Sequence, residues 1–220
     1  MPTSGATPRV NAPAPPLLAQ VVADGTHAHP QPHALVIGHA LLRDLADAAH
    51  QLCMLHGRHP DVIERAAAHP IDAASAAWLN RAVHGFAGER AYLVALVAAA
   101  GPLPSTPGQA ETEAVVTAQR HALAMLSQSD RPGCALGAAV ALVLDWQAIR
   151  TALDHGAERM GLPVPPSTLP DREDTLALLD ELAGSAAPVG RAMLFGAQQM
   201  LAQHRGLWDL LQARAEARAR

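Results

Sequence analysis

Residues 130–160 constrain the fold more than any other part of the sequence. Ser129-Asp130-Arg131-Pro132 places hydrogen-bond acceptors and a proline where a helix begins, and Gly161-Leu162-Pro163 places glycine and then proline where one ends. About thirty residues without proline lie between these signals, which predicts a helix about 45 Å long at 1.5 Å per residue. We expect this helix to be the buried centre of the domain.

The predicted central helix has two distinct faces. The spacing of three and four residues along a helix places its large apolar side chains on one ridge: Ala139, Leu142, Val143, Trp146, Ile149 and Leu153. A line of small residues runs beside the ridge: Cys134, Ala138, Ala141, Asp145, Ala148 and Ala152. Small side chains predict that a neighbouring helix approaches closely, which would take the Asp145 carboxylate out of water. Asp145 therefore needs a partner, which is an arginine such as Arg90 or Arg120, another hydrogen-bond donor, or a metal ion.

Proline and glycine boundaries divide the rest of the chain into further helices, and no segment shows the alternation typical of strands. The pattern predicts an all-α, single-domain antiparallel bundle of six to seven helices around the central one. The expected helices span residues 34–56, 60–68, 72–100, 109–127, 130–160, 171–184 and 188–214. The predicted helical domain spans residues 34–214. Residues 1–33 are predicted to be a proline-rich mobile tail with Leu17 to Val22 held against the domain, and residues 215–220 are predicted to be a short arginine-rich tail.

Composition excludes several classes of protein. All 16 basic residues are arginine, so Schiff-base lysines and the P-loop lysine are absent. A formal charge of −4 gives no reason to expect a nucleic-acid partner or an acidic membrane surface. The apolar run of the central helix is shorter than the about 20 residues that a membrane span needs. Two cysteines and the lack of a recognisable signal peptide predict a cytoplasmic location.

A histidine-rich segment extends from residue 27 to residue 59. His27, His29 and His33 lie among prolines, and His50, Cys53, His56 and His59 follow at steps of three. Each step of three residues falls about 60° short of one full helical turn, so His50 and His59 would point in opposite directions on one helix. We interpret these histidines as solvated or capping residues near a helix end. Whether the segment binds metal stays open at this stage.

A second set of polar residues falls on the inward faces of the long helices. Its members are Glu89, His121, Asp145 and His204, with His39 as a fifth. Carboxylate and imidazole ligands suit iron, manganese or zinc, so these residues are candidate ligands of a divalent metal. His204 or His39 alone would suffice as the axial ligand of a b-type haem. The alternative is that each polar group is satisfied by a neighbouring core residue.

The number and length of the helices across residues 34–214 resemble those of ferritin-like and haem-oxygenase-like helical proteins. The resemblance implies a site at the centre of the bundle. No glutamate is followed three residues later by a histidine, so the Glu-x-x-His pairs of ferritin-like di-iron proteins are missing. Similarity to the thiaminase-like members of the haem-oxygenase-like group implies Cys134 as a nucleophile, with Glu89 and Tyr92 across the bundle.

The sequence contains no motif that fixes a reaction, and it leaves open whether the chain is an enzyme. The prediction is therefore a small-ligand-binding or protein-interaction module. Trp208, Leu211 and the segment Arg214–Arg220 are a candidate edge for pairing with a second copy or with another protein. The alternative is a metal-dependent or cysteine-dependent enzyme of ferritin-like or haem-oxygenase-like type, with its site in the bundle centre.

Overall fold

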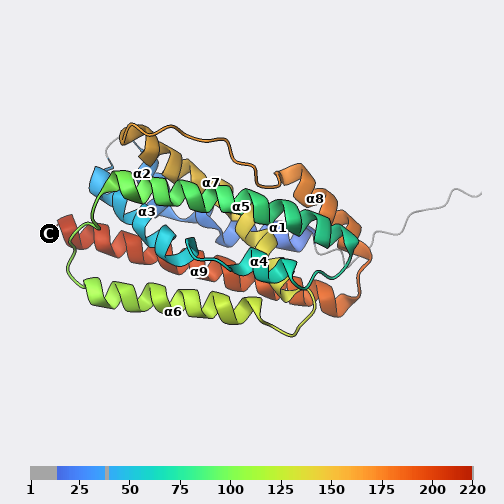
Figure 1. Cartoon of the computed structure of the whole chain (residues 1–220). Helices are drawn as coiled ribbons and strands as arrows, with labels where there is room; N and C mark the ends of the chain where they lie inside the picture. Colours follow the sequence, from blue (N-terminus) through green and yellow to red (C-terminus); the bar gives the residue numbers. More distant parts are fainter. Residues whose placement is uncertain (1–13, 38–39, 220) are drawn as a thin grey trace, which may run out of the picture.

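The structure, a computed structural model, describes residues 14–37 and 40–219. Within these ranges the chain forms nine α-helices, two 3₁₀ turns and no strand, which confirms the all-α bundle and exceeds the expected number of helices (Figure 1). The elements are α1 (Ala14–Asp24), η1 (Thr26–Ala28), α2 (Pro30–Val36), α3 (Leu42–His56), α4 (Val62–Ala67), α5 (Ala73–Ala100), α6 (Gln109–Ser127), α7 (Cys134–Arg159), α8 (Arg172–Glu181), η2 (Leu182–Gly184) and α9 (Ala187–Ala219).

The predicted central helix is α7, which contacts every other α-helix of the described chain. All residues from Leu136 to Trp146 are buried, and Trp146 is fully buried, as its place on the apolar ridge predicted. By length and composition α7 could cross a membrane, so the expectation that its apolar run is too short for a span is wrong. However, 83% of its most apolar 18-residue window is buried inside the fold. This is the pattern of a core helix.

Helices α7 and α9 approach each other closely through glycines, as the line of small residues predicted. A β-carbon built on Gly196 would lie 2.0 Å from the backbone oxygen of Cys134, and one on Gly137 would lie 2.0 Å from that of Met193. Neither position can carry a side chain without moving a backbone. The crossing therefore brings the backbones of α7 and α9 into direct contact.

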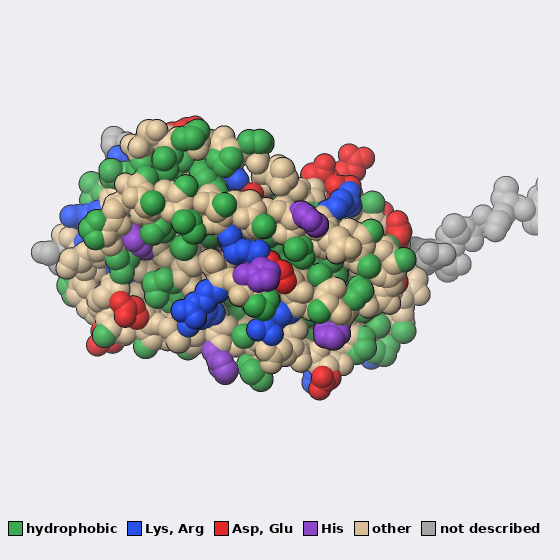
Figure 2. All heavy atoms as spheres, in the orientation of Figure 1, with side chains coloured by type: hydrophobic (Ala, Val, Ile, Leu, Met, Phe, Trp, Pro, Cys, Tyr) green, Lys and Arg blue, Asp and Glu red, His purple; other side chains and the backbone are tan. Residues whose placement is uncertain are grey.

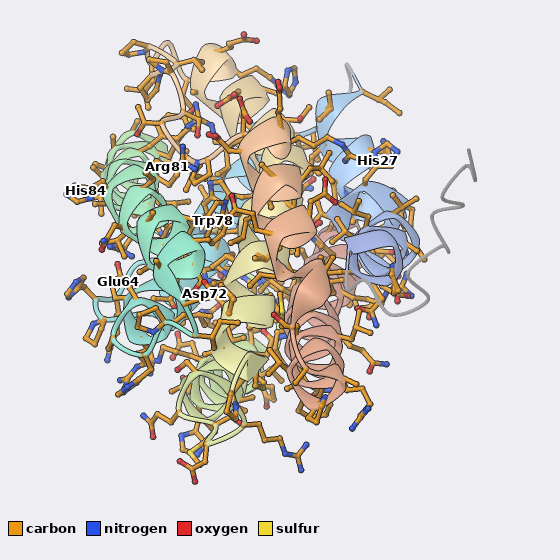
Figure 3. The ribbon with its side chains drawn as sticks, turned by 90° about the vertical axis from the view of Figure 1, so that its right-hand side faces the viewer. His27, Glu64, Asp72, Trp78, Arg81 and His84 are labelled. Carbon is orange, nitrogen blue, oxygen red and sulfur yellow. The ribbon has the colours of Figure 1, made fainter. Side chains whose placement is uncertain are left out.

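The amino-terminal segment is more ordered than predicted. Leu17 on α1 is fully buried, as expected, but α1, η1 and α2 all pack against α7 and α9. The prediction of a mobile tail is therefore wrong for residues 14–33, while residues 1–13 lie outside the described part. The prolines begin helices here: Pro30 starts α2, and the His29 side chain accepts a hydrogen bond from the Gln31 N–H. Figure 3 shows His27 of this segment on the opposite side of the molecule from α5, which carries His84.

The expected pairing edge at the carboxyl end of α9 is also corrected. Trp208 and Leu211 are buried in the core. Arg214 donates hydrogen bonds to both carboxylate oxygens of Asp47 on α3, at 2.8 and 2.9 Å, and Arg218 donates to Asp47 at 2.6 Å. The arginines near the end of α9 therefore join it to α3 instead of forming a free basic surface.

We predict that Gly196→Ala destabilises the fold, because the added methyl group would push the α9 backbone away from α7. Overpacking of this kind costs on the order of 1–3 kcal/mol. Gly88→Ala on α5 is the matched control, because its β-carbon meets nothing within 4 Å, and alanine should stabilise that exposed helix position by up to about 1 kcal/mol. Urea unfolding of both variants measures the contrast, and a harmless Gly196→Ala would contradict the close approach.

We predict that the Asp47 ion pairs stabilise the fold at neutral pH and lose this effect in acid. Burial raises the pKa of Asp47, but hydrogen bonds from Arg214 and Arg218 more than offset it and hold the pKa below its ordinary value of 3.8. The stabilisation is thus complete above pH 3.8 and lost as pH falls through the lower folded value. Asp47→Asn should cost about 3–5 kcal/mol at pH 7, and its difference from wild type should shrink below pH 3.8. Asp174→Asn, at an exposed ion pair with Arg81, is the control.

Candidate functional site

A row of four titratable side chains crosses the centre of the bundle. Asp145 of α7 contacts His204 of α9, with 2.6 Å between Oδ2 and Nδ1. His204 contacts His56, the last residue of α3, with 3.0 Å between the two Nε2 atoms. His56 in turn contacts Asp61, the residue before α4, with 3.1 Å between Nδ1 and Oδ2. We call this row the Asp–His–His–Asp chain.

The Asp145 end of the chain is closed by the amino-terminal segment. The backbone N–H and the hydroxyl of Thr26 each donate a hydrogen bond of 2.7 Å to the carboxylate, and Trp208 Nε1 donates to the same hydroxyl at 2.9 Å. Gly25 permits this approach, because a β-carbon there would lie 2.6 Å from Asp145 Oδ1. The prediction that Asp145 is buried and has donor partners is confirmed. Arg90 is not one of these partners, since it pairs with Glu64.

His56 is one of the two inner members of the Asp–His–His–Asp chain and is fully buried. Its ring packs edge-on against Trp146 and Phe86, with centroid distances of 5.5 and 6.1 Å. Burial lowers the pKa of His56, and the hydrogen bond to Asp61 acts in the opposite direction. The interpretation of His56 as a solvated capping residue is therefore wrong. Phe86 of α5, Trp146 of α7 and His204 of α9 surround the end of α3, so a position that is usually open to water becomes part of the core.

The Asp61 end of the chain reaches the surface. The Asp61 side chain is 10% exposed. Its backbone N–H donates to the Glu64 carboxylate at 2.8 Å, and Glu64 is itself paired with Arg90 of α5. This anchoring fixes Asp61 at the start of α4 with its carboxylate directed both to His56 and to an open pocket.

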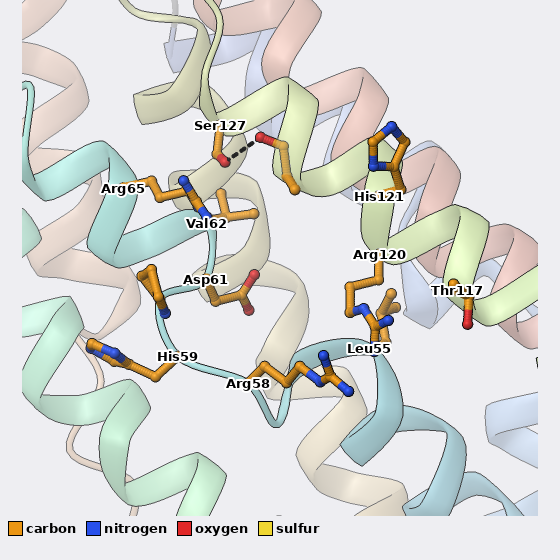
Figure 4. A pocket seen from close by; sticks show the side chains of 12 residues that line it. Leu55, Arg58, His59, Asp61, Val62, Arg65, Thr117, Arg120, His121 and Ser127 are labelled. Carbon is orange, nitrogen blue, oxygen red and sulfur yellow. Dashed lines mark hydrogen bonds between the residues drawn. The ribbon is translucent and has the colours of Figure 1, made fainter.

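The pocket next to Asp61 has a volume of about 470 Å³ and lies between α3, α4 and α6. Three arginines line it from three parts of the chain: Arg58 from the loop after α3, Arg65 from α4 and Arg120 from α6. In Figure 4, Asp61 lies between Arg58 and Arg65, and Arg120 faces them from α6. Figure 2 shows arginine and histidine side chains gathered on this face. We call this site the arginine pocket.

The arginine pocket is positively charged although the chain carries −4 overall. Three guanidinium groups face one carboxylate, and the imidazole rings of His59 and His121 also line the pocket. Within the described residues, none of the three guanidinium groups forms a hydrogen bond or ion pair with a protein acceptor. A larger hollow of about 790 Å³ shares Arg65 and Ser127 with the pocket and is lined mainly by the loops after α4 and α6.

Glu89 and Tyr92, two of the predicted catalytic residues, belong to a different cluster under the proline-rich loop after α7. Glu89 accepts hydrogen bonds from Arg150 at 2.8 and 3.0 Å, from Trp146 Nε1 at 2.9 Å and from Ser167 Oγ at 2.7 Å. Tyr92 donates to Asp154 at 2.9 Å, and burial together with this bond raises the pKa of the phenol. Every polar atom of Glu89 is thus committed to holding the loop on α5 and α7.

Cys134, the third predicted catalytic residue, does not join this cluster. It is buried in the first turn of α7, and twelve residues, about 18 Å of helix, separate it from the Trp146 that contacts Glu89. Its backbone oxygen faces Gly196 at the crossing with α9. Cys134 therefore has the position of a small packing residue at the crossing of α7 and α9.

The predicted metal ligands are also dispersed. The structure brings Asp145 and His204 together, whereas His121 lies exposed at the rim of the arginine pocket and Glu89 is held by Arg150. His39 lies outside the described residues. No group of three or more histidine, cysteine, aspartate or glutamate side chains in residues 14–37 and 40–219 is arranged to hold a metal ion. The same core position that made His204 a candidate ligand makes it a hydrogen-bond partner of Asp145.

Sequence reasoning missed several residues of this site. Thr26 was assigned to the mobile tail, and Asp61, Arg58 and Arg65 were not singled out. Arg120 was named only as a possible partner of Asp145, whereas it lines the arginine pocket. The pair Asp61 and Glu64 carries a readable signal, because an acceptor followed three residues later by glutamate is a helix-capping pattern. No comparable signal marks the arginines, which meet only after α3, α4 and α6 are folded together.

Comparison with known families assigns the chain to one of them. Residues 21–219 match the model of a family of unknown function, DUF6975, so the chain belongs to that family. No curated protein and no solved structure matches it. The matched range begins within α1 and includes both ends of the Asp–His–His–Asp chain.

We predict that Asp145→Ala strongly destabilises the protein, because it leaves the buried His204 ring and the Thr26 N–H without their acceptor. Removing one member of a buried charged pair costs about 3–5 kcal/mol. Asp209→Ala is the control, because Asp209 also contacts a histidine, His29 at 3.0 Å, but its side chain is 68% exposed. Thermal unfolding monitored by circular dichroism compares the two, and equal effects would contradict the role assigned to Asp145.

Proposed function

We propose that the protein is a small-ligand-binding module whose ligand is an organic anion held in the arginine pocket. The single observation that carries this proposal is the convergence of Arg58, Arg65 and Arg120 on one hollow that is lined by a single carboxylate, with no ion pair to any of the three among the described residues. Arginines whose side chains are buried elsewhere in the described residues are paired: Arg214 and Arg218 with Asp47, and Arg150 with Glu89. The pocket arginines therefore have donors to offer to a ligand.

The chemistry of the pocket favours a carboxylate or phosphate group on the ligand. A guanidinium group presents a planar fork of donors that matches the oxygens of either anion, and charge-assisted bonds of this kind are about twice as strong as neutral ones. The volume of about 470 Å³ is that of a site for a small molecule. Asp61 adds an acceptor at the floor, which would bind a hydroxyl or amino group of the same molecule.

We also propose a cytoplasmic location. Both cysteines, Cys53 and Cys134, are free thiols, the state that a reducing compartment maintains. Burial raises the pKa of Cys53 and keeps it in the unreactive thiol form.

We predict that Arg65→Ala and Arg120→Ala each weaken anion binding by about tenfold to a hundredfold, the value of one hydrogen bond between charged groups. Isothermal titration calorimetry with sulfate, and then with panels of small carboxylates and phosphate monoesters, measures the loss and separates the two ligand classes. Arg81→Ala is the matched control: Arg81 lies on α5, as labelled in Figure 3, and pairs with Asp174 at 3.0 Å. Unchanged binding in both pocket variants, or an equal loss in Arg81→Ala, would overturn the proposed function.

A further inference from the structure

The Asp–His–His–Asp chain contains three contacts of hydrogen-bond length between four titratable groups. Each contact needs one proton between its two atoms, because two lone pairs at 3 Å repel. The intact chain therefore holds three protons. Two ionised carboxylates and two neutral imidazoles supply only two. The geometry thus requires one proton more than the ordinary neutral-pH forms of these groups contain.

The surroundings of the chain indicate where the third proton resides. Thr26 donates two hydrogen bonds to Asp145, which stabilises the ionised carboxylate. Burial lowers the pKa of His56, which favours its neutral form with Nδ1–H directed to Asp61. The third proton is then on His204, whose two N–H groups donate to Asp145 and to Nε2 of His56. His204 is in this arrangement an imidazolium paired with a buried carboxylate.

Two short transfers carry this proton to the pocket. The Nε2 proton of His204 moves to Nε2 of His56, and the Nδ1 proton of His56 moves to Oδ2 of Asp61. The chain holds three protons before and after, and all three hydrogen bonds remain. Only the charge has moved: His204 becomes neutral, and Asp61, now an uncharged carboxyl that donates to Nδ1 of His56, no longer places a negative charge beside an anion in the arginine pocket.

We propose that the arginine pocket takes up its anion together with one proton, which the Asp–His–His–Asp chain stores and presents at Asp61. The proposal rests on the proposed function, because it concerns the same pocket. The positive potential of Arg58, Arg65 and Arg120 disfavours the third proton in the empty site. An anion that neutralises these arginines removes this penalty, so anion and proton each raise the affinity for the other.

Other charged groups lie around the Asp–His–His–Asp chain and have to be considered in the test. They are Glu64 of α4 with Arg90 of α5, Glu89 and Arg150 beyond the Trp146 ring, Arg58 and His59 of the loop, and Arg65, Arg120 and His121 around the pocket. The carboxylates among them are already paired with arginine. His59 and His121 are imidazoles that line the pocket outside the Asp–His–His–Asp chain, so both are replaced before proton uptake by that chain is measured.

The test is calorimetric titration of the full chain with sulfate, an anion that does not titrate near neutral pH, in buffers of different ionisation enthalpy. The starting protein is the double variant His59→Gln, His121→Gln. We expect sulfate to bind with uptake of up to one proton. We also expect its affinity to fall by up to about tenfold per pH unit as the Asp–His–His–Asp chain loses its third proton. Adding His204→Gln should abolish the uptake. Uptake that persists in that triple variant would overturn the inference.

The remaining outcomes are separable. Sulfate binding without proton uptake at any pH in the double variant overturns this inference and leaves the proposed function intact. Absence of sulfate binding at every pH in folded wild-type protein overturns both. If His204→Gln does not fold, proton NMR of the wild type decides: a strongly deshielded imidazole N–H signal that disappears as pH rises is expected, and its absence overturns the stored proton.

Discussion

The buried carboxylate of Asp145 is the constraint on which the rest of the structure depends. It is 2% exposed on the central helix, and a charge in that position is very costly unless hydrogen-bond donors surround it. Two of the donors come from Thr26 and one from His204. The amino-terminal segment is thus required in the core for a polar reason as well as an apolar one. His204 then fixes the ring of His56, and His56 directs Asp61 to the surface.

Two further buried acids join distant parts of the chain in the same way. Asp47 connects α3 to the end of α9, and Glu89 connects α5 to α7 and to the loop that carries Ser167. Only 3% of the residues are aromatic, so much of the core consists of small apolar side chains. Helices packed through alanine and glycine present few distinctive shapes. We infer that these ion pairs set the register of the helices, a role that buried charges have in some other proteins.

The sequence was sufficient to predict features that depend on local rules. Proline and glycine positions marked α5 and α7 within a few residues, and the small-residue line of α7 predicted the close approach of another helix. The burial of the His56 ring was not predicted because it depends on side chains of α5, α7 and α9 that meet at the end of α3. The arginine pocket escaped detection for a related reason, since Arg58 and Arg120 are 62 residues apart in the sequence. Local sequence patterns do not indicate which side chains from distant segments come together in the folded protein.

The relation between the pocket and the chain behind it follows from their charges. Three arginines at the surface would draw protons away from nearby groups, yet the hydrogen-bond geometry behind them requires an additional proton. Asp145 resolves this conflict from the opposite end, because its negative charge holds the proton on the buried side at His204, farther from the arginines. An anion in the pocket would reverse the balance and draw the proton toward Asp61. The occupancy of the pocket therefore decides how firmly the hydrogen-bonded row holds its additional proton and which end of the row carries it.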